Sequence, residues 1–218
     1  ALMGQYQYQA AYDEFAKIIE QYPGWPAVET NLAIAQMNRQ SPEDEQAALE
    51  RLNRVLLDDP NLLRAQYTAG LLAWYVGDVD TARDHFNYVA EADPADGFAA
   101  YYLGQCAMDA GNYQEALKWF SRAAKVEPYL RSTYYAKSQA YQRLRQPEEA
   151  KEVLETFDQL SNNPRSMLAE IKYTRMGPKA EAEVVDLSDG SIAKLPSGDV
   201  FGPLKLLAPQ LQEQIPSW

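Results

Sequence analysis

The sequence predicts an all-α fold, a solenoid of helix–turn–helix repeats, because apolar positions recur at a fixed period. Prolines stand at 60, 94 and 128, two successive steps of 34 residues. Upstream of each proline, an Ala is followed four positions later by a large apolar residue and then by a small or apolar one. These trios are Ala48, Leu52 and Val55, then Ala82, Phe86 and Val89, then Ala116, Phe120 and Ala123. The spacing places each trio on one face of an amphipathic helix.

A first helix and a tight turn precede each amphipathic helix. Leu103-Gly104 matches Ala69-Gly70 one period earlier, and small residues at this point let the two helices of a hairpin approach closely. Gly77 and Gly111 occupy equivalent places between the helices, where glycine lowers the cost of a left-handed turn. The repeating unit is therefore an antiparallel helical hairpin.

A 34-residue helix–turn–helix with this skeleton resembles the tetratricopeptide repeat (TPR) family, and residues 97–130 match its signature most closely. The resemblance covers about residues 4–160 and implies a right-handed superhelical solenoid. The chain departs from the family pattern at Ala100, where an aromatic residue is usual, and at Ala73 and Ala107, where Tyr is usual. The turn and closing positions are kept.

We expect the array to occupy residues 1–160, as one half repeat followed by four full repeats. The half repeat covers residues 4–25, and the full repeats cover about 26–62, 63–96, 97–130 and 131–162. Each hairpin leaves an apolar face open, and stacking on its neighbours covers that face. The half repeat has a second helix without a first, so either upstream residues have been removed or the array begins on a lone helix.

A capping helix is predicted directly after the array, at the start of a second region that covers residues 161–218. Ser161-Asn-Asn-Pro164 is typical of a helix start, and Met167, Leu168 and Ile171 form an apolar stripe on the turns that follow. Gly177-Pro178 ends the stripe. Such a helix would cover the open end of the stack.

A β-hairpin is predicted over residues 183–195, where β-branched residues flank Asp189-Gly190. A two-stranded ribbon is marginally stable alone, so we expect it to pack on the solenoid or to accept a strand from a partner. An apolar segment from Val200 to Ile215 follows.

The composition excludes several classes of partner. The formal net charge is -11, and such a surface repels the phosphates of nucleic acids and anionic lipids. No apolar run approaches the roughly 18 residues of a membrane helix, and no signal peptide opens the chain. We therefore expect a soluble protein, cytoplasmic or periplasmic, that neither binds nucleic acid nor inserts into a membrane.

Metal, thiol and cofactor chemistry are not expected. One cysteine, Cys106, and one histidine, His85, cannot build a zinc site or a disulfide, and both are predicted to be structural. The paired carboxylates Asp58-Asp59 and Glu148-Glu149 are adjacent in sequence and point in different directions, which does not suit acid–base work. No phosphate-binding glycine loop or nucleophile elbow occurs. The sequence therefore predicts no metal, no cofactor and no enzyme.

In the TPR family the first helices line a concave groove in which peptides bind. Matching of repeat positions gives these candidate partner-binding residues: Arg64, Tyr67, Leu71, Trp74, Tyr75, Phe98, Tyr101, Gln105, Met108, Tyr135, Gln139 and Arg143. Exposed Tyr and Trp beside Arg dominate binding hot spots, so a protein or peptide segment with apolar side chains would fit this groove.

An alternative for these aromatic residues is that several wedge between repeats and never meet solvent. For Trp74 and Tyr75 the two interpretations are equally favoured, whereas for Tyr67 and Tyr101 exposure is favoured. The second-helix residues Phe86, Trp119 and Phe120 are predicted to be core. The family's clamp of lysines and asparagines for a chaperone C-terminus is absent, because Tyr67, Leu71, Tyr101 and Gln105 stand at the matching places.

The leading hypothesis is a non-catalytic protein-interaction module that uses the groove to assemble or localise a complex. The alternative is a regulatory or targeting region of a larger enzyme whose catalytic part lies outside this chain. Self-association through the aromatic surfaces is a third interpretation.

Overall fold

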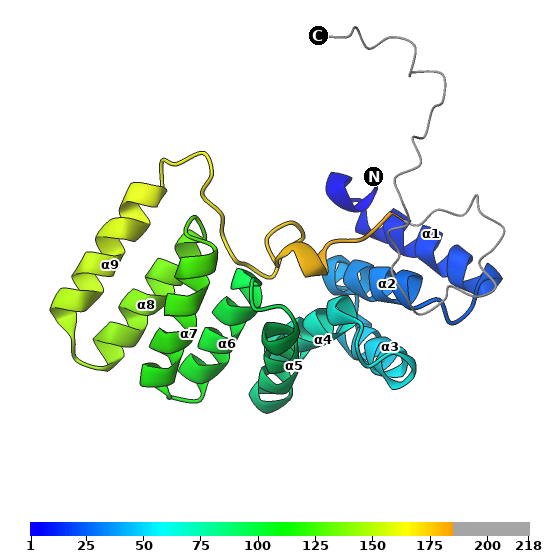
Figure 1. Ribbon diagram of the computed structural model, residues 1–218. Helices are drawn as coiled ribbons and strands as arrows, with labels where there is room; N and C mark the ends of the chain where they lie inside the picture. Colours follow the sequence, from blue (N-terminus) through cyan, green and yellow to red (C-terminus); the bar gives the residue numbers. More distant parts are fainter. Residues whose placement is uncertain (185–218) are drawn as a thin grey trace, which may run out of the picture. The chain divides into compact units, whose positions relative to one another are not determined.

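The computed structural model describes residues 1–184, which fall in the first of two compact units, Ala1–Val185. Within the described residues the regular structure is entirely helical (Figure 1). The predicted all-α repeat fold is therefore confirmed for this part of the chain. The α-helices are α1 (Tyr8–Gln21), α2 (Pro26–Arg39), α3 (Asp44–Asp58), α4 (Leu63–Tyr75), α5 (Val79–Ala92), α6 (Gly97–Asp109), α7 (Tyr113–Val126), α8 (Arg131–Arg143) and α9 (Pro147–Leu160). Two 3-10 turns, η1 (Met3–Gln5) and η2 (Pro178–Ala180), complete the set.

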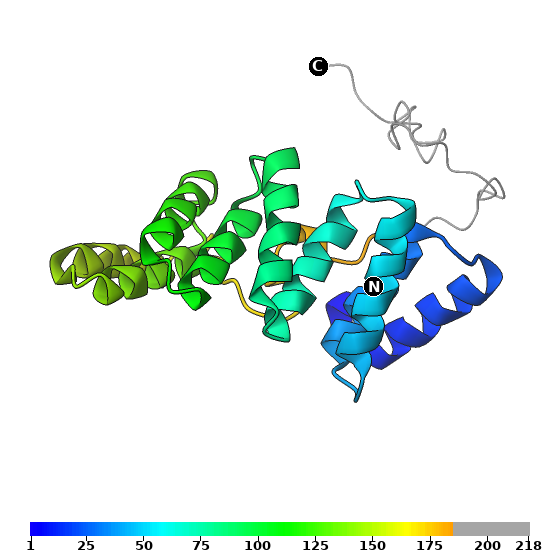
Figure 2. The ribbon, with the colours of Figure 1, turned by 90° about the horizontal axis from the view of Figure 1, so that it is seen from below.

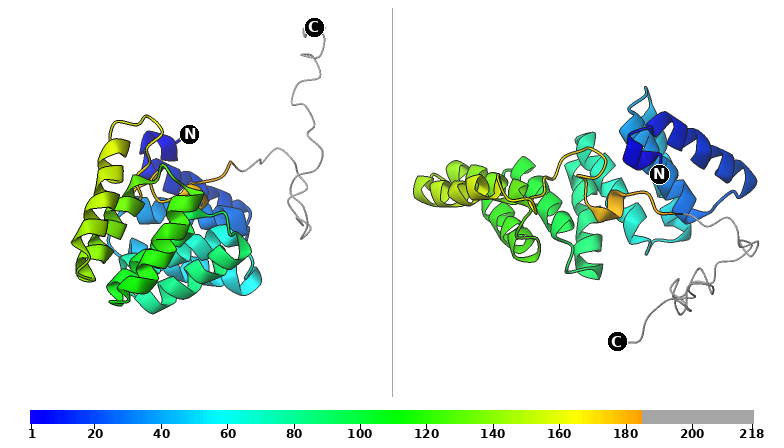
Figure 3. Two further views of the ribbon diagram at one scale, coloured as in Figure 1. Left: turned by 60° about the vertical axis from the view of Figure 1, so that its left-hand side comes forward. Right: turned by 90° about the horizontal axis from the view of Figure 1, so that it is seen from above.

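Helices α2 to α9 form four hairpins that stack in chain order, and α1 packs on the first of them (Figures 1 and 2). Within each hairpin the two helices contact one another, and each new first helix packs on the second helix of the preceding hairpin. Figure 3 shows the same order of helices from two further directions. Stacking therefore covers the apolar faces that the isolated hairpins would leave open.

First and second helices differ in how much of their surface is buried. Every residue from 65 to 73 of α4 is buried, as are nearly all those of α6 up to Ala107. The second helices bury a single stripe, which in α7 consists of Ala116, Phe120 and Ala123. The recurring trio of the sequence is therefore the core-facing stripe of the second helix.

Glycines set the distance between the helices of a hairpin. A Cβ on Gly104 would collide with the Phe120 ring, and one on Gly70 would lie 3.0 Å from Cε1 of Phe86. Gly77 and Gly111 have φ angles of +86° and +76°, the left-handed conformation expected between the helices. Close approach and turn geometry thus both depend on glycine.

The predicted capping helix is wrong. Residues 161–184 contain no α-helix, and residues 166–183, here named the strap, cross the first helices from α8 back to α2 (Figure 1, yellow to orange). A helix between Pro164 and Gly177 would be short, and an isolated helix of about 12 residues is marginally stable in water. The extended course instead buries Tyr173, Met176 and Ala180 against the array, which takes their apolar surface out of water.

The predicted β-hairpin and the apolar segment after it lie outside the described residues, apart from the first two residues of the hairpin. No helix within residues 1–184 combines the length and the hydropathy required to cross a bilayer.

We predict that Gly104→Val destabilises the protein by about 2 kcal/mol, because the new side chain overpacks against Phe120. Gly4→Val is the control, since nothing lies within 4 Å of a Cβ built on Gly4. Urea denaturation measures both free energies of unfolding. Equal stability of the two variants would contradict the close approach of α6 and α7.

Candidate functional site

The strap lies on the inner face of the array, which we define as the side of the first helices α2, α4, α6 and α8 along which it runs, including residues of these helices that it leaves exposed. Its first anchor is at α8, where the Met167 N–H donates to the Tyr129 carbonyl at 2.8 Å and the Arg131 N–H donates to the Met167 carbonyl at 3.0 Å. The Ala169 N–H then donates to Oγ of Ser132 at 3.0 Å. A short bridge of strand type therefore starts the strap.

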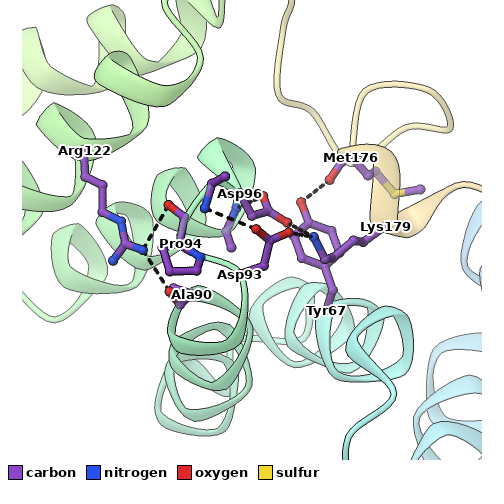
Figure 4. Close-up of polar contacts among 10 residues, drawn as sticks. Tyr67, Ala90, Asp93, Pro94, Asp96, Arg122, Met176 and Lys179 are labelled. Carbon is purple, nitrogen blue, oxygen red and sulfur yellow. Dashed lines mark hydrogen bonds and ion pairs between the residues drawn. The ribbon is translucent and has the colours of Figure 1, made fainter. Parts of the chain in front are cut away.

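The second anchor is Tyr67 on α4, which is completely buried. Its hydroxyl donates a hydrogen bond to the Met176 carbonyl (Figure 4). Burial raises the pKa of Tyr67 well above its ordinary value, so the hydroxyl keeps its proton and remains a donor. The next strap residue, Gly177, has a φ of +102°, and a Cβ there would lie 2.5 Å from Oη of Tyr67 and 3.0 Å from Cβ of Phe98. Only glycine fits this point without strain.

The third anchor is an ion-pair cluster around Lys179. Its Nζ lies 2.6 Å from Oδ2 of Asp93 and 2.8 Å from Oδ2 of Asp96 (Figure 4). The other carboxylate oxygen of Asp96 accepts from the Ala99 N–H at 2.8 Å and caps α6. The hydrogen bond from Lys179 holds the pKa of Asp93 below its ordinary value. Burial lowers the pKa of Lys179, but the two carboxylates outweigh it and the net shift is upward.

The fourth anchor is a pair of asparagines on α2. Buried Asn31 donates from Nδ2 to the Glu183 carbonyl at 2.9 Å and accepts from the Glu183 N–H at 3.0 Å. Oδ1 of Asn38 accepts from the Tyr173 N–H at 2.8 Å. Arg64 on α4 adds a hydrogen bond of 2.5 Å to the Glu181 carbonyl. Side chains of the inner face thus hold the strap largely by hydrogen bonds to the strap's backbone.

Five of the twelve candidate residues lie beneath the strap or inside the array. Tyr67 and Leu71 are fully buried, Phe98 and Tyr101 are 6% exposed, and the Arg64 side chain is 11% exposed. The expectation that Tyr67 and Tyr101 face solvent was therefore wrong. Tyr67 packs edge-on against Tyr102 and Phe86, and the strap covers its hydroxyl.

The other seven candidates, here named the open residues, reach solvent. Tyr75, Tyr135, Gln139 and Arg143 are exposed, whereas Trp74, Gln105 and Met108 are half-buried. Trp74 packs between α4 and α6, with its ring on Tyr102 and its Nε1 donating to Asp109 at 2.8 Å, yet it remains partly exposed to solvent. Tyr75 is 47% exposed and therefore does not wedge between repeats.

Models of the tetratricopeptide repeat family match residues 67–129 and 132–164. Residues 67–164 belong to the tetratricopeptide repeat family. The matched segments contain most of α4, the whole of α5, α6, α7 and α9, and all of α8 except Arg131. No curated protein matches the chain significantly.

Solved structures extend the likeness in fold to most of the chain. MamA 41-end from Desulfovibrio magneticus RS-1 is 19% identical, with 76% of this chain and 92% of that chain covered and a TM-score of 0.68. MamA AMB-1 is 23% identical, with 73% and 92% covered and a TM-score of 0.65. MamA MSR-1 is 22% identical, with 73% and 90% covered and a TM-score of 0.63. At these identities the likeness concerns the fold alone.

The cysteine, the histidine and the second-helix aromatic residues singled out in the sequence pack within the TPR array. Cys106 is buried, which raises its thiol pKa to about 12, and Nδ1 of His85 lies 2.6 Å from Oε1 of Gln66. Phe86 and Phe120 are core residues as predicted, whereas Trp119 is half-buried beneath Arg122. Within residues 1–184 no group of His, Cys, Asp and Glu is arranged to hold a metal ion.

The sequence interpretation missed the groups that hold the strap. Asp93 and Asp96 were overlooked because an aspartate just before a helix commonly acts as its N-cap, and Asp96 does cap α6. Asn31 carried a usable signal, since it is a polar residue whose neighbours three and four positions away, on the same helix face, are apolar: Ala27, Val28, Ile34 and Ala35. Buried polar groups require partners, and the strap backbone supplies them.

We predict that Tyr67→Phe lowers the free energy of unfolding by about 1–2 kcal/mol, because the Met176 carbonyl is left buried without a donor. Tyr135→Phe is the matched control, since Tyr135 is 48% exposed and the same hydroxyl is removed. Guanidinium denaturation measures the free energy of unfolding of both variants. A loss no larger for Tyr67→Phe than for the control would show that the Tyr67 hydroxyl does not hold the strap.

We predict that Lys179→Met costs about 2 kcal/mol at neutral pH, because the Asp96 carboxylate stays buried without its cation. Since Lys179 lowers the pKa of Asp93, the stability from this pair is present above the ordinary carboxyl pKa and is lost as the pH falls through the lowered value. The difference between the two proteins should therefore shrink below about pH 4.

Denaturation curves at several pH values measure this difference. Lys172→Met is the control, because Lys172 is an exposed lysine of the same strap. A difference that stays constant from pH 7 to pH 3 would contradict the assignment to Lys179 and its carboxylates.

Proposed function

We propose that the chain is a non-catalytic protein-interaction scaffold, and that the inner face of its TPR array binds an extended segment of a partner protein. One observation carries the proposal. The inner face already holds an extended segment, through side chains of α2, α4 and α8 that bond to its backbone. Backbone N–H and C=O groups are common to all peptide segments, so such a surface suits segments other than the strap.

The twelve candidate residues differ in whether a partner can reach them. The open residues can contact a partner while the strap is in place. Exposed Tyr75 and Tyr135 offer large apolar areas with a polar edge, the kind of side chain that dominates binding energy. Arg64, Tyr67 and Phe98 contact the strap and become available to a partner only where it is displaced, whereas Leu71 and Tyr101 are buried in the array.

The test is affinity capture from an extract of the source cells with the tagged full chain and with a Tyr75→Ala/Tyr135→Ala variant. We expect the variant to capture at least about five-fold less of the partner, since each truncated hot-spot residue costs more than about 1 kcal/mol. Light scattering of the purified chain identifies a partner that is a second copy of the chain.

Leu57→Ala is the control for this capture, because Leu57 lies on second helix α3 and is 83% exposed. It should leave capture unchanged. Equal capture by the double variant, the control and the unaltered chain would refute the inner face as the binding surface.

A further inference from the structure

The strap is held by two kinds of contact. Tyr67, Asn31, Asn38 and Ser132 bond to backbone atoms and do not distinguish one sequence from another. Two other contacts depend on side chains. The surface of Tyr67 and Phe98 leaves no room for a Cβ at position 177, and the carboxylates of Asp93 and Asp96 surround the Lys179 ammonium (Figure 4).

We propose that the inner face over α4 and α6 is a recognition site for an extended segment that carries a glycine and, two residues later, a lysine. The strap fills this site in cis with Gly177-Pro178-Lys179, and partner segments of the same pattern compete with it. The inference deepens the proposed function and rests on it, because it names the partner segment that the inner face selects.

Charge explains why the pattern requires a lysine two residues after the glycine. The Asp96 side chain is 5% exposed, and within residues 1–184 its other polar contact is the cap of α6, so a cation is needed to neutralise it. An ammonium group on a flexible stem reaches both carboxylates, as Lys179 does. The net charge of -11 also attracts cationic segments from a distance.

The strap belongs to the same chain as the inner face, so a free segment must compete with a segment that is covalently attached. A short linker gives the strap an effective concentration on the order of millimolar at its own site. A free segment at micromolar concentration therefore binds measurably only where the strap cannot seat. A variant that obstructs the strap and leaves the inner face unaltered separates binding in cis from binding in trans.

Gly177→Val in the full chain is that variant, because the new side chain meets Tyr67 and Phe98 and the backbone there has positive φ. Fluorescence anisotropy measures binding of a labelled peptide with the natural sequence of residues 166–184. We expect the peptide to bind the Gly177→Val chain at least ten-fold more tightly than it binds the unaltered chain.

Two matched changes test the lysine subsite. A peptide with Lys179→Glu should bind the Gly177→Val chain at least ten-fold more weakly than the natural peptide. Asp93→Asn/Asp96→Asn in the Gly177→Val chain should weaken the natural peptide to the same extent. Asparagine caps a helix about as well as aspartate, so these changes remove charge and keep the start of α6.

Circular dichroism reports whether the Gly177→Val chain keeps its helices. Cleavage by trypsin after Arg175, a residue that both variants keep, reports release of the strap. If that chain does not fold, Lys179→Glu in the full chain serves instead, because it repels the strap from Asp93 and Asp96. Protection of the strap from trypsin in both variants would overturn the inference, since neither position would then decide its seating.

The inference would also be overturned if the natural peptide bound the Gly177→Val chain and the unaltered chain equally well. Equal binding of the natural peptide and the Lys179→Glu peptide to the Gly177→Val chain would overturn it too. These outcomes are separate from failure of the proposed function. That failure is seen when the Tyr75→Ala/Tyr135→Ala variant captures its partner as well as the unaltered chain does.

Discussion

The structure depends on one constraint, namely that no hairpin of this chain can bury its apolar surface alone. The second helices present a single stripe, such as Ala116, Phe120 and Ala123, whereas the first helices α4 and α6 are buried almost throughout. A first helix reaches that degree of burial because second helices pack on both of its sides. Gly70 and Gly104 permit the approach, since the ring of the paired second helix occupies the space of their missing side chains.

The same constraint explains the strap. Stacking leaves the first helices with one uncovered surface, the inner face, and it contains apolar groups such as Tyr67 and Phe98 beside polar ones such as Asn31. An extended segment satisfies both, because its backbone bonds to the polar groups while Met176 and Ala180 fill the apolar gaps. A helix in that place would use its own N–H and C=O groups internally and leave the Asn31 amide N–H and the Tyr67 hydroxyl without acceptors.

The repeating part of the fold could be predicted because its signals are local and recur. The 34-residue period, the stripe of each second helix and the turn glycines all concern residues within one hairpin, and all were confirmed within residues 1–184. The course of the strap could not be predicted in this way. Met167, Leu168 and Ile171 have helical spacing, yet their conformation is decided by contacts with residues more than 30 positions away, such as Ser132. For the same reason the exposure of Tyr67 was misjudged, because the atoms that cover its hydroxyl are 109 positions away in sequence.

Amide hydrogen exchange in the strap tests the central claim most directly, namely that the strap is a bound part of the folded TPR array. The N–H groups of Ala169, Tyr173 and Glu183 donate to side chains on α8 and α2. The account predicts that these three amides exchange slowly, with protection comparable to that of the backbone amides in α4. Exchange of all three at the rate of an unstructured peptide, while α4 remains protected, would contradict it.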